Sequence, residues 1–162
     1  MGTVEELADR FQAGRYAAID IGTVTCRMLV ADVDDSGRLR ELDREYAITN
    51  LGEDVDATGS LKPEAMQRVA DVVARFLDVL RGFATSEHPC IRMTAMATSA
   101  ARDARNASEF EALLAKLGVT LSVIPGEREA ALSFAGASCD FPGERLLVVD
   151  IGGGSTEGDR KS

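Results

Sequence analysis

The sequence contains few cysteines, and their placement excludes two common kinds of site. Cys26, Cys90 and Cys139 are widely spaced and form no CxxC pair. An odd number at this spacing provides neither a disulfide framework nor a zinc cluster, and it suits a reducing compartment. The single histidine, His88, precedes Pro89 in a predicted loop, where a surface turn residue is a better interpretation than a catalytic base. The expected location is the cytoplasm.

Long apolar runs and an excess of positive charge are also absent from the sequence. No apolar run approaches the roughly 18 residues of a membrane span. The segment that follows Met1 lacks the basic region and apolar core of a signal peptide. Lys and Arg number 18 against 27 Asp and Glu, which gives a net charge of −9. We therefore expect neither nucleic acid nor a membrane as a partner, and any phosphate site must be local.

The overall composition is that of a globular chain. A length of 162 residues suits one domain, or half of something larger. Hydrophobic residues make up 45% and charged residues 28%, with only four prolines and no low-complexity tract. This composition excludes disorder and collagen, and it allows a substantial buried core.

Hydrophobic periodicity divides the first half of the chain into strands and one long helix. The first 14 residues carry apolar side chains at helical spacing, which predicts a short amphipathic helix ending at Gly14. Three strands separated by turn residues follow, at residues 16–21, 25–33 and 39–48. They predict an antiparallel meander. After a polar loop, a helix begins at Pro63 and runs to about Phe83.

The second half of the chain alternates strands with helices. The predicted strands are residues 90–97, 120–124 and 146–150, and the predicted helices are residues 107–117 and 127–138. Together with the meander, this order describes a mixed sheet with helices packed on both faces. The expected fold class is therefore α/β.

Two segments share one design, in which an apolar strand ends in an aspartate and a glycine turn with hydroxyl side chains follows. In the first, Asp20 precedes Gly22 and Thr23, and in the second, Asp150 precedes Gly152, Gly153, Gly154 and Ser155. Glycines let backbone N–H groups converge on an anion, and hydroxyls add donors. A carboxylate at the strand end can hold Mg²⁺ or a water beside a phosphate. Each segment is a candidate phosphate loop.

A hairpin turn is the alternative interpretation of each segment. The D-x-G sequence at Asp20 is common turn chemistry, so both interpretations stay open for the first segment. Three consecutive glycines from Gly152 to Gly154 cost backbone entropy and are unnecessary for a hairpin. The second segment therefore favours a phosphate site.

A hydroxyl pair and an arginine follow the strand at residues 90–97. Thr98 and Ser99 lie at its carboxyl end, where ligands of α/β sheets usually bind. Arg102 comes one helical turn after Thr98 and can present a planar fork to phosphate. The alternative for Arg102 is an exposed salt bridge with Asp103 or Glu109.

Glu129 is a candidate for orienting a water molecule. It lies in the first turn of the helix that follows Pro125 and Gly126. Acids are also favoured at helix N-termini because of the helix dipole, and Glu127 is another one, so both interpretations stay open. Arg105 lacks comparable support and is interpreted as a solvated surface charge.

The order of these motifs resembles the exopolyphosphatase and guanosine pentaphosphate phosphatase family. That family belongs to the superfamily of acetate and sugar kinases, heat-shock chaperones and actin. The resemblance is carried by residues 18–25, 97–106, 123–130 and 149–157. It implies a ribonuclease-H-like α/β domain, in which a mixed sheet with a three-stranded antiparallel meander has helices on both faces.

The resemblance also implies how the chain is divided. We expect a helical extension over residues 1–14, the first lobe of a two-lobed protein over residues 15–157, and a tail unlike the family over residues 158–162. The second, C-terminal lobe would then be missing. A homodimer is left open.

By the same resemblance, the complete enzyme would release the terminal phosphate of inorganic polyphosphate or guanosine pentaphosphate. Water would attack with the assistance of Mg²⁺. Glu129 would act as the general base, and Asp20, Asp150 and Glu157 would lie at the metal. The residues implied to bind phosphate are Gly22, Thr23, Thr98, Arg102, Gly152, Gly153, Gly154 and Ser155.

The sequence departs from the family pattern at two motif positions. Val24 replaces the usual asparagine of the first loop and cannot donate a side-chain amide hydrogen bond, and Ala131 replaces a usual arginine. These departures keep open a noncatalytic nucleotide- or phosphate-binding module. A kinase of the wider superfamily is a third possibility. The net charge of −9 favours short chains or the guanosine nucleotide, unless the missing lobe is basic.

Overall fold

The computed structural model describes residues 12–161 apart from 90, 142 and 155. The strands are β1 (Gly14–Ile21), β2 (Thr25–Val33), β3 (Leu39–Ile48), β4 (Arg92–Ala97), β5 (Leu121–Val123), β6 (Leu146–Ile151) and β7 (Thr156–Lys161). The helices are α2 (Val55–Thr58), α3 (Pro63–Arg81), α4 (Ser99–Asp103), α5 (Ala107–Ala115) and α6 (Gly126–Ser138). Most of the predicted N-terminal helix lies outside the described residues, and Gly14, which should end it, begins β1.

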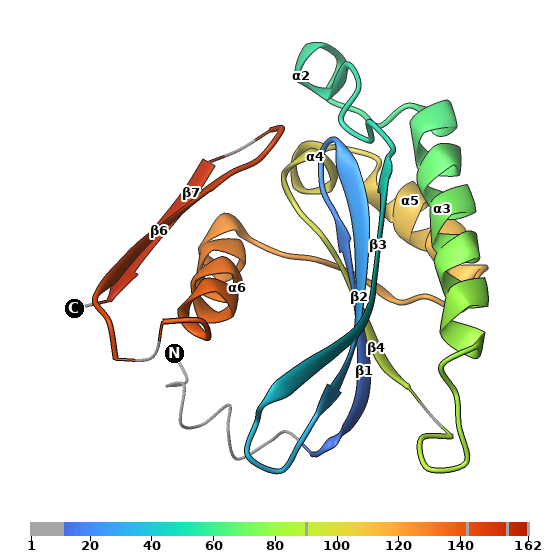
Figure 1. Ribbon diagram of the computed structural model, residues 1–162. Helices are drawn as coiled ribbons and strands as arrows, with labels where there is room; N and C mark the ends of the chain where they lie inside the picture. The colour runs from blue at the N-terminus through green and yellow to red at the C-terminus, as the bar shows by residue number, and fades with distance from the viewer. Residues whose placement is uncertain (1–11, 90, 142, 155, 162) are drawn as a thin grey trace.

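The main sheet has five strands in the order β3-β2-β1-β4-β5 (Figure 1). The first three strands form the predicted antiparallel meander, and β4 adds to β1 in parallel. In this register Asp20 lies opposite Arg27 of β2 and Met96 of β4. The parallel pairing of β1 and β4 places both of their carboxyl ends at one edge of the sheet.

The core lies between one face of this sheet and helices α3 and α5 (Figure 1). Alternate residues of β1, Ala17, Ile19 and Ile21, are buried on that face, as the two-residue period of a strand requires. The buried stripe of α3 follows helical spacing and comprises Met66, Val69, Val73, Phe76 and Leu80. Each such buried side chain contributes about 1.5–3 kcal/mol. This core fixes the sheet edge that carries the candidate site.

Helix α6 lies on the other side of the main sheet, and its principal contacts are with β6 and β7 (Figure 1). The expectation that the strand at residues 146–150 joins the mixed sheet is wrong. Strand β6 instead pairs antiparallel with β7 in a separate sheet of two strands. The segment directly after β6 can reach it through a short turn, which costs little loop-closure entropy. The sequence pattern predicts no strand at residues 158–161, but these residues belong to β7.

Two short helices, α2 and α4, are not predicted by the sequence analysis. Helix α2 lies in the segment expected to be a polar loop, and Arg105 fixes its end by donating a hydrogen bond to the carbonyl of Thr58 at 2.7 Å. Arg105 is exposed as predicted, but it also has this structural role. The side-chain amide of Asn106 bonds both the N–H and the carbonyl of Leu61. The end of the 97–106 motif therefore holds the loop before α3.

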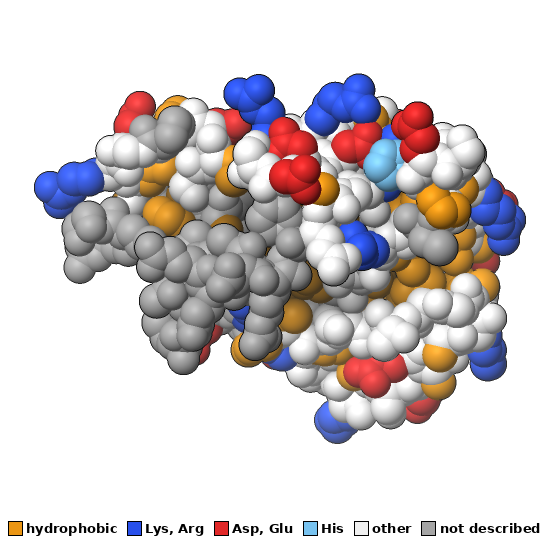
Figure 2. Space-filling view, turned by 90° about the horizontal axis from the view of Figure 1, so that it is seen from below, with side chains coloured by type: hydrophobic (Ala, Val, Ile, Leu, Met, Phe, Trp, Pro, Cys, Tyr) orange, Lys and Arg blue, Asp and Glu red, His pale blue; other side chains and the backbone are white. Residues whose placement is uncertain are grey.

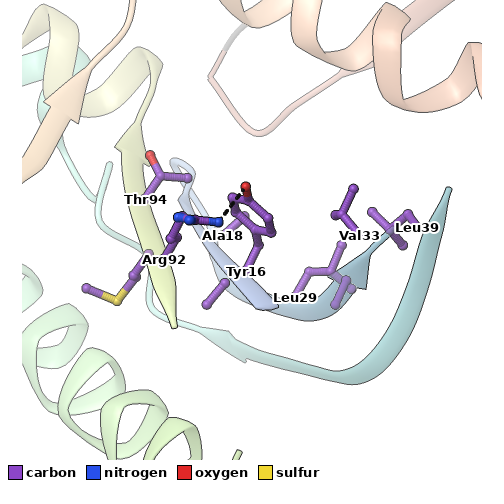
Figure 3. Close-up of a pocket in the computed structure, with 10 residues that line it drawn as sticks. Tyr16, Ala18, Leu29, Val33, Leu39, Arg92 and Thr94 are labelled. Carbon is purple, nitrogen blue, oxygen red and sulfur yellow. Dashed lines mark hydrogen bonds between the residues drawn. The ribbon is translucent and has the colours of Figure 1, made fainter. Parts of the chain in front are cut away.

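An apolar hollow of about 390 Å³ lies near the start of β1 (Figure 3). Tyr16, Ala18 and Leu29 line it, and the Arg92 guanidinium lies 5.4 Å from the centre of the Tyr16 ring. The β1 residues that line this hollow, Tyr16 to Ala18, precede Asp20 and the glycine turn, so the hollow is separate from the glycine loops. Within the described residues, no helix has the length and apolar character needed to cross a membrane.

Candidate phosphate-binding site

The first glycine turn joins β1 to β2 and is braced from outside. The Gly22 N–H donates to the carbonyl of Thr25 at 2.9 Å, which closes the turn. The carbonyl of Thr23 accepts a hydrogen bond from the N–H of Gly52 at 2.9 Å. The carbonyl of Val24 accepts from the N–H of Thr49 at 2.8 Å. These bonds hold the first loop, residues 22–25, in one position.

The glycine loop at residues 152–154 lies directly against the first loop. A Cβ on Gly154 would lie 2.6 Å from Thr23 Oγ1 and 2.8 Å from Ser99 Oγ. A Cβ on Gly153 would overlap a methyl group of Val24. The same residues also connect β6 to β7, so the hairpin interpretation is confirmed, and the phosphate site stays a prediction. Close approach to the first loop explains why glycine is needed here. Ser155 lies outside the described residues.

Arg102 of α4 and Glu129 of α6 form an ion pair. Arg102 Nη1 donates to the carbonyl of Ile124 at 3.0 Å and to Glu129 Oε2 at 3.3 Å. The side chains are 27% and 15% exposed, respectively, so solvent screens this ion pair only in part. Arg102 is also near Asp103, but at 3.9 Å. The alternative salt bridge is therefore the longer of the two contacts.

Thr98 lies between the sheet and α4. Its N–H donates to the carbonyl of Ile21 at 3.3 Å, and its carbonyl accepts from the N–H of Arg102 at 2.9 Å. Thr98 is buried, and its hydroxyl makes no capping bond to α4. This placement links the ends of β1 and β4 to the helix that carries Arg102.

Asp20 and Asp150 contribute carboxylates from the ends of β1 and β6. Desolvation raises the pKa of Asp20, and the negative charge of Asp150 also raises it. The positive charge of Arg27 opposes this shift, but the pKa of Asp20 is raised overall. Asp150 Oδ2 accepts a hydrogen bond from Ser133 Oγ at 2.6 Å. Strand pairing places Glu157 opposite Asp150, but its side chain lies outside the description. Within the described part of the chain, no three His, Cys, Asp or Glu side chains group as a metal centre.

The structure thus brings the predicted residues together in three local groups. Thr23 lies against the glycine loop, and Arg102 donates a hydrogen bond to Glu129. The charge of Asp150 raises the pKa of Asp20. Ser133 is not among the residues predicted from the sequence, although it lies one helical turn after Glu129 and so shares its helix face. Neither is Gly52, where a Cβ would overlap a methyl group of Thr23. No local sequence pattern predicts that contact between Gly52 and Thr23.

Hydroxyls, a guanidinium and glycine backbone beside two carboxylates are the groups expected around a phosphoryl group. Residues 29–158 match the model of the Ppx/GppA phosphatase family. The chain belongs to this family. The resemblance seen in the order of the four motifs is confirmed.

Two proteins similar in sequence to this chain are longer than it. Exopolyphosphatase 2 of Mycobacterium tuberculosis is 41% identical over 154 residues, which cover 88% of this chain and 47% of that protein. The bifunctional 3-dehydroquinate synthase/phosphatase of Fusobacterium nucleatum is 34% identical over 149 residues, or 87% of this chain and 22% of that protein. The chain spans about half the length of the first relative, and less of the second.

Solved Ppx/GppA structures share the fold. The PPX-GPPA enzyme of Aquifex aeolicus superposes with a TM-score of 0.78 at 31% identity, over 93% of this chain and 49% of that one. An exopolyphosphatase of Cytophaga hutchinsonii gives a TM-score of 0.80 at 32% identity, over 90% and 46%. The predicted α/β fold class, with its meander and mixed sheet, is confirmed.

Proposed function

We propose that this chain forms the first part of a hydrolase that releases the terminal phosphate of inorganic polyphosphate or guanosine pentaphosphate. The observation that carries the proposal is the contact of Gly154 with the hydroxyls of Thr23 and Ser99. A glycine backbone and two hydroxyls meet there, and α4, which carries Ser99, also carries Arg102, the partner of Glu129. Family membership and the exopolyphosphatase relative support this substrate class.

The charge of the chain favours a short substrate. In Figure 2, which shows one face, basic and acidic side chains are interspersed, and the described residues of that face form no continuous basic track. With a net charge of −9, this part of the protein offers little attraction to a long polyanion. Short polyphosphates or the guanosine nucleotide are therefore the better candidates, unless the remaining half of the protein is basic.

In the proposed mechanism, the described residues bind the phosphate and position water. Backbone N–H groups of residues 152–154 and the hydroxyls of Thr23 and Thr98 donate to phosphate oxygens. Arg102 compensates charge on the phosphate while it also holds Glu129. Glu129 then orients the attacking water and accepts its proton. Ser155 stays a predicted phosphate ligand.

The two aspartates fit a magnesium ion. Mg²⁺ in phosphate sites usually keeps several waters and takes one or two carboxylates together with substrate phosphates, so it does not need a cluster of three side chains. Asp20 and Asp150 are close enough for the charge of Asp150 to raise the pKa of Asp20. We propose that these two would hold Mg²⁺, with Glu157 as a further candidate. When bound, the ion would neutralise charge on the phosphate.

A noncatalytic phosphate-binding module is the second candidate. It is favoured by Val24, whose methyl group occupies the space beside Gly153 where a polar side chain would otherwise reach the loop. In that case the glycine loop would bind phosphate without positioning it for attack. The two candidates differ in turnover and not in binding.

Phosphate release tests the proposal. Malachite-green detection should find phosphate released from short polyphosphate or guanosine pentaphosphate by a version extended through the second half of the protein. The 162-residue chain alone should release little. Glu129→Gln in the extended version should lower the rate about 10²–10⁴-fold, the usual contribution of a positioned base.

Two outcomes would contradict parts of this assignment. Wild-type turnover by Glu129→Gln would remove Glu129 from the mechanism. Saturable phosphate binding with no release by the extended protein would favour the noncatalytic module.

A further inference from the structure

Ser99 is a buried polar residue that faces the glycine loop. It is the first residue of α4, and only 4% of its surface is exposed. Its Oγ lies 2.8 Å from the position that a Cβ on Gly154 would take. Thr23 Oγ1 lies 2.6 Å from the same position. Two hydroxyls from different parts of the sheet edge therefore converge on one glycine.

Neither hydroxyl has a hydrogen-bond partner within the described residues. Side-chain bonds are found at other hydroxyls, such as Thr58 Oγ1, which donates to the carbonyls of Asp54 and Ser60. No such bond is found for Thr23 or Ser99 in the part of the chain that the structure describes. Thr23 is half-buried, and among the described residues only Thr49 Oγ1 is a fully buried side-chain atom without a partner, so the hydroxyls of Thr23 and Ser99 are accessible to a ligand or water.

Ser99, and not its neighbour Thr98, borders Gly154. The heavy atoms nearest to the Gly154 Cβ position are those of Thr23 and Ser99. Thr98 precedes α4, and its backbone bonds Ile21 and Arg102. Of these two adjacent residues, Ser99 is therefore the one whose hydroxyl lies next to Gly154.

We propose that Ser99 is a phosphate-binding residue, whose hydroxyl donates to the same phosphoryl group as Thr23 at Gly154. This inference rests on the proposed function, and it adds a donor from α4 to the donors of the two loops. A phosphoryl oxygen suits this position because it accepts several hydrogen bonds at once. Because Gly154 has no Cβ, its backbone can approach both hydroxyls closely.

Inorganic phosphate is the probe that tests this role. Binding is measured by calorimetric titration of the 162-residue chain, with chloride at matched ionic strength as the reference. Ser99→Ala removes one oxygen and should raise the phosphate Kd about tenfold, as expected for a lost bond to a charged acceptor. Ser108→Ala is the matched control, because Ser108 is exposed on α5 and makes no bond to the loops. Its Kd should equal that of the wild type.

Melting curves in chloride identify any variant that does not fold, and Ser99→Thr, which keeps the hydroxyl, gives a second measurement. Affinity near that of the wild type in Ser99→Thr, together with weaker binding by Ser99→Ala, supports the inference. Equal affinity of Ser99→Ala and wild type overturns it, while the proposed function stands. Absence of phosphate binding by the wild-type chain also overturns the inference, whereas the proposed function fails only if the extended protein releases no phosphate. Reduced binding by Ser99→Ala without phosphate release by the extended protein supports the Ser99 role and contradicts the proposed hydrolysis.

Discussion

Arg102 joins α4 to α6 by contacting Glu129 at 3.3 Å while it also bonds the Ile124 carbonyl. Both bonds use the same guanidinium nitrogen, Nη1. Nε lies 3.9 Å from Asp103 Oδ1, and Nη2 makes no hydrogen bond within the described residues. The residue proposed to bind the substrate is thus also the residue that places the proposed base.

Replacing Arg102 by lysine tests whether phosphate binding needs the planar guanidinium or only a positive charge. Arg102→Lys keeps the charge but cannot bond the Ile124 carbonyl, Glu129 and a phosphate with one rigid group. We expect the phosphate Kd to rise about tenfold or more, measured by calorimetric titration. Arg105→Lys is the control, because Arg105 bonds the Thr58 carbonyl. An equal loss of affinity in both variants would contradict a specific role for Arg102.

The contact between Gly153 and Val24 can be tested by a double-mutant cycle. Gly153→Ala adds a Cβ that overlaps a methyl group of Val24, so we expect it to weaken phosphate-dependent thermal stabilisation. Val24→Ala removes that methyl group and should restore much of the lost effect in the double variant. The coupling between the two changes should be about 0.5–3 kcal/mol, the range for residues in contact. Strictly additive effects would show that the two loops do not touch in solution.

Asp20 should cost the folded chain stability at neutral pH. Desolvation and the charge of Asp150 raise its pKa on folding, so the ionised form is disfavoured in the folded protein. The cost is present above the folded pKa and disappears as the pH falls below it. Asp20 is exposed in the folded chain, so solvent screens part of this cost, and Asp20→Asn should raise the melting temperature at pH 7 by only about 1 °C, with a smaller difference at pH 4. The exposed Asp35→Asn serves as the control, and a lower melting temperature for Asp20→Asn at pH 7 would refute the prediction.

Asp32 should have the opposite effect. It accepts hydrogen bonds from Arg15 at 2.7 and 3.0 Å and from Arg40 at 2.8 Å, which hold its pKa well below the usual range. Its contribution is present above the unfolded pKa and is lost as the pH falls through the folded pKa. Asp32→Asn should lower the free energy of unfolding by about 1–3 kcal/mol at pH 7. Urea denaturation at pH 7 and pH 3 measures this, and a pH 7 value equal to the wild type would be inconsistent with the network.

The sequence predicted those elements whose pattern is local. The alternation of β1 and the apolar stripe of α3 depend on residues a few positions apart, so their bounds agree with the structure to within a few residues. The order of the motifs also predicts roles for Arg102 and Glu129, which stay predictions, but it does not predict their direct contact.

Contacts between distant segments could not be predicted in the same way. Nothing local to Gly52 indicates that it must fit against Thr23, and nothing in residues 158–161 predicts pairing with β6. Polar residues in a strand such as β7 satisfy backbone hydrogen bonds as well as apolar residues do. Their pairing depends on the partner segment and the turn between them.

The bracing of the loop before α3 determines where the chain can tolerate inserted residues. Surface loops usually accept insertions because few contacts depend on their length. This one is bonded at both ends, through Gly52 to Thr23 and through Leu61 to Asn106. Added residues should therefore be accepted only at the exposed positions near Asp56 and Ala57, whereas insertions next to Gly52 or Leu61 would displace the first loop. Tags, reporter groups or grafted peptides are therefore best introduced near Asp56 and Ala57.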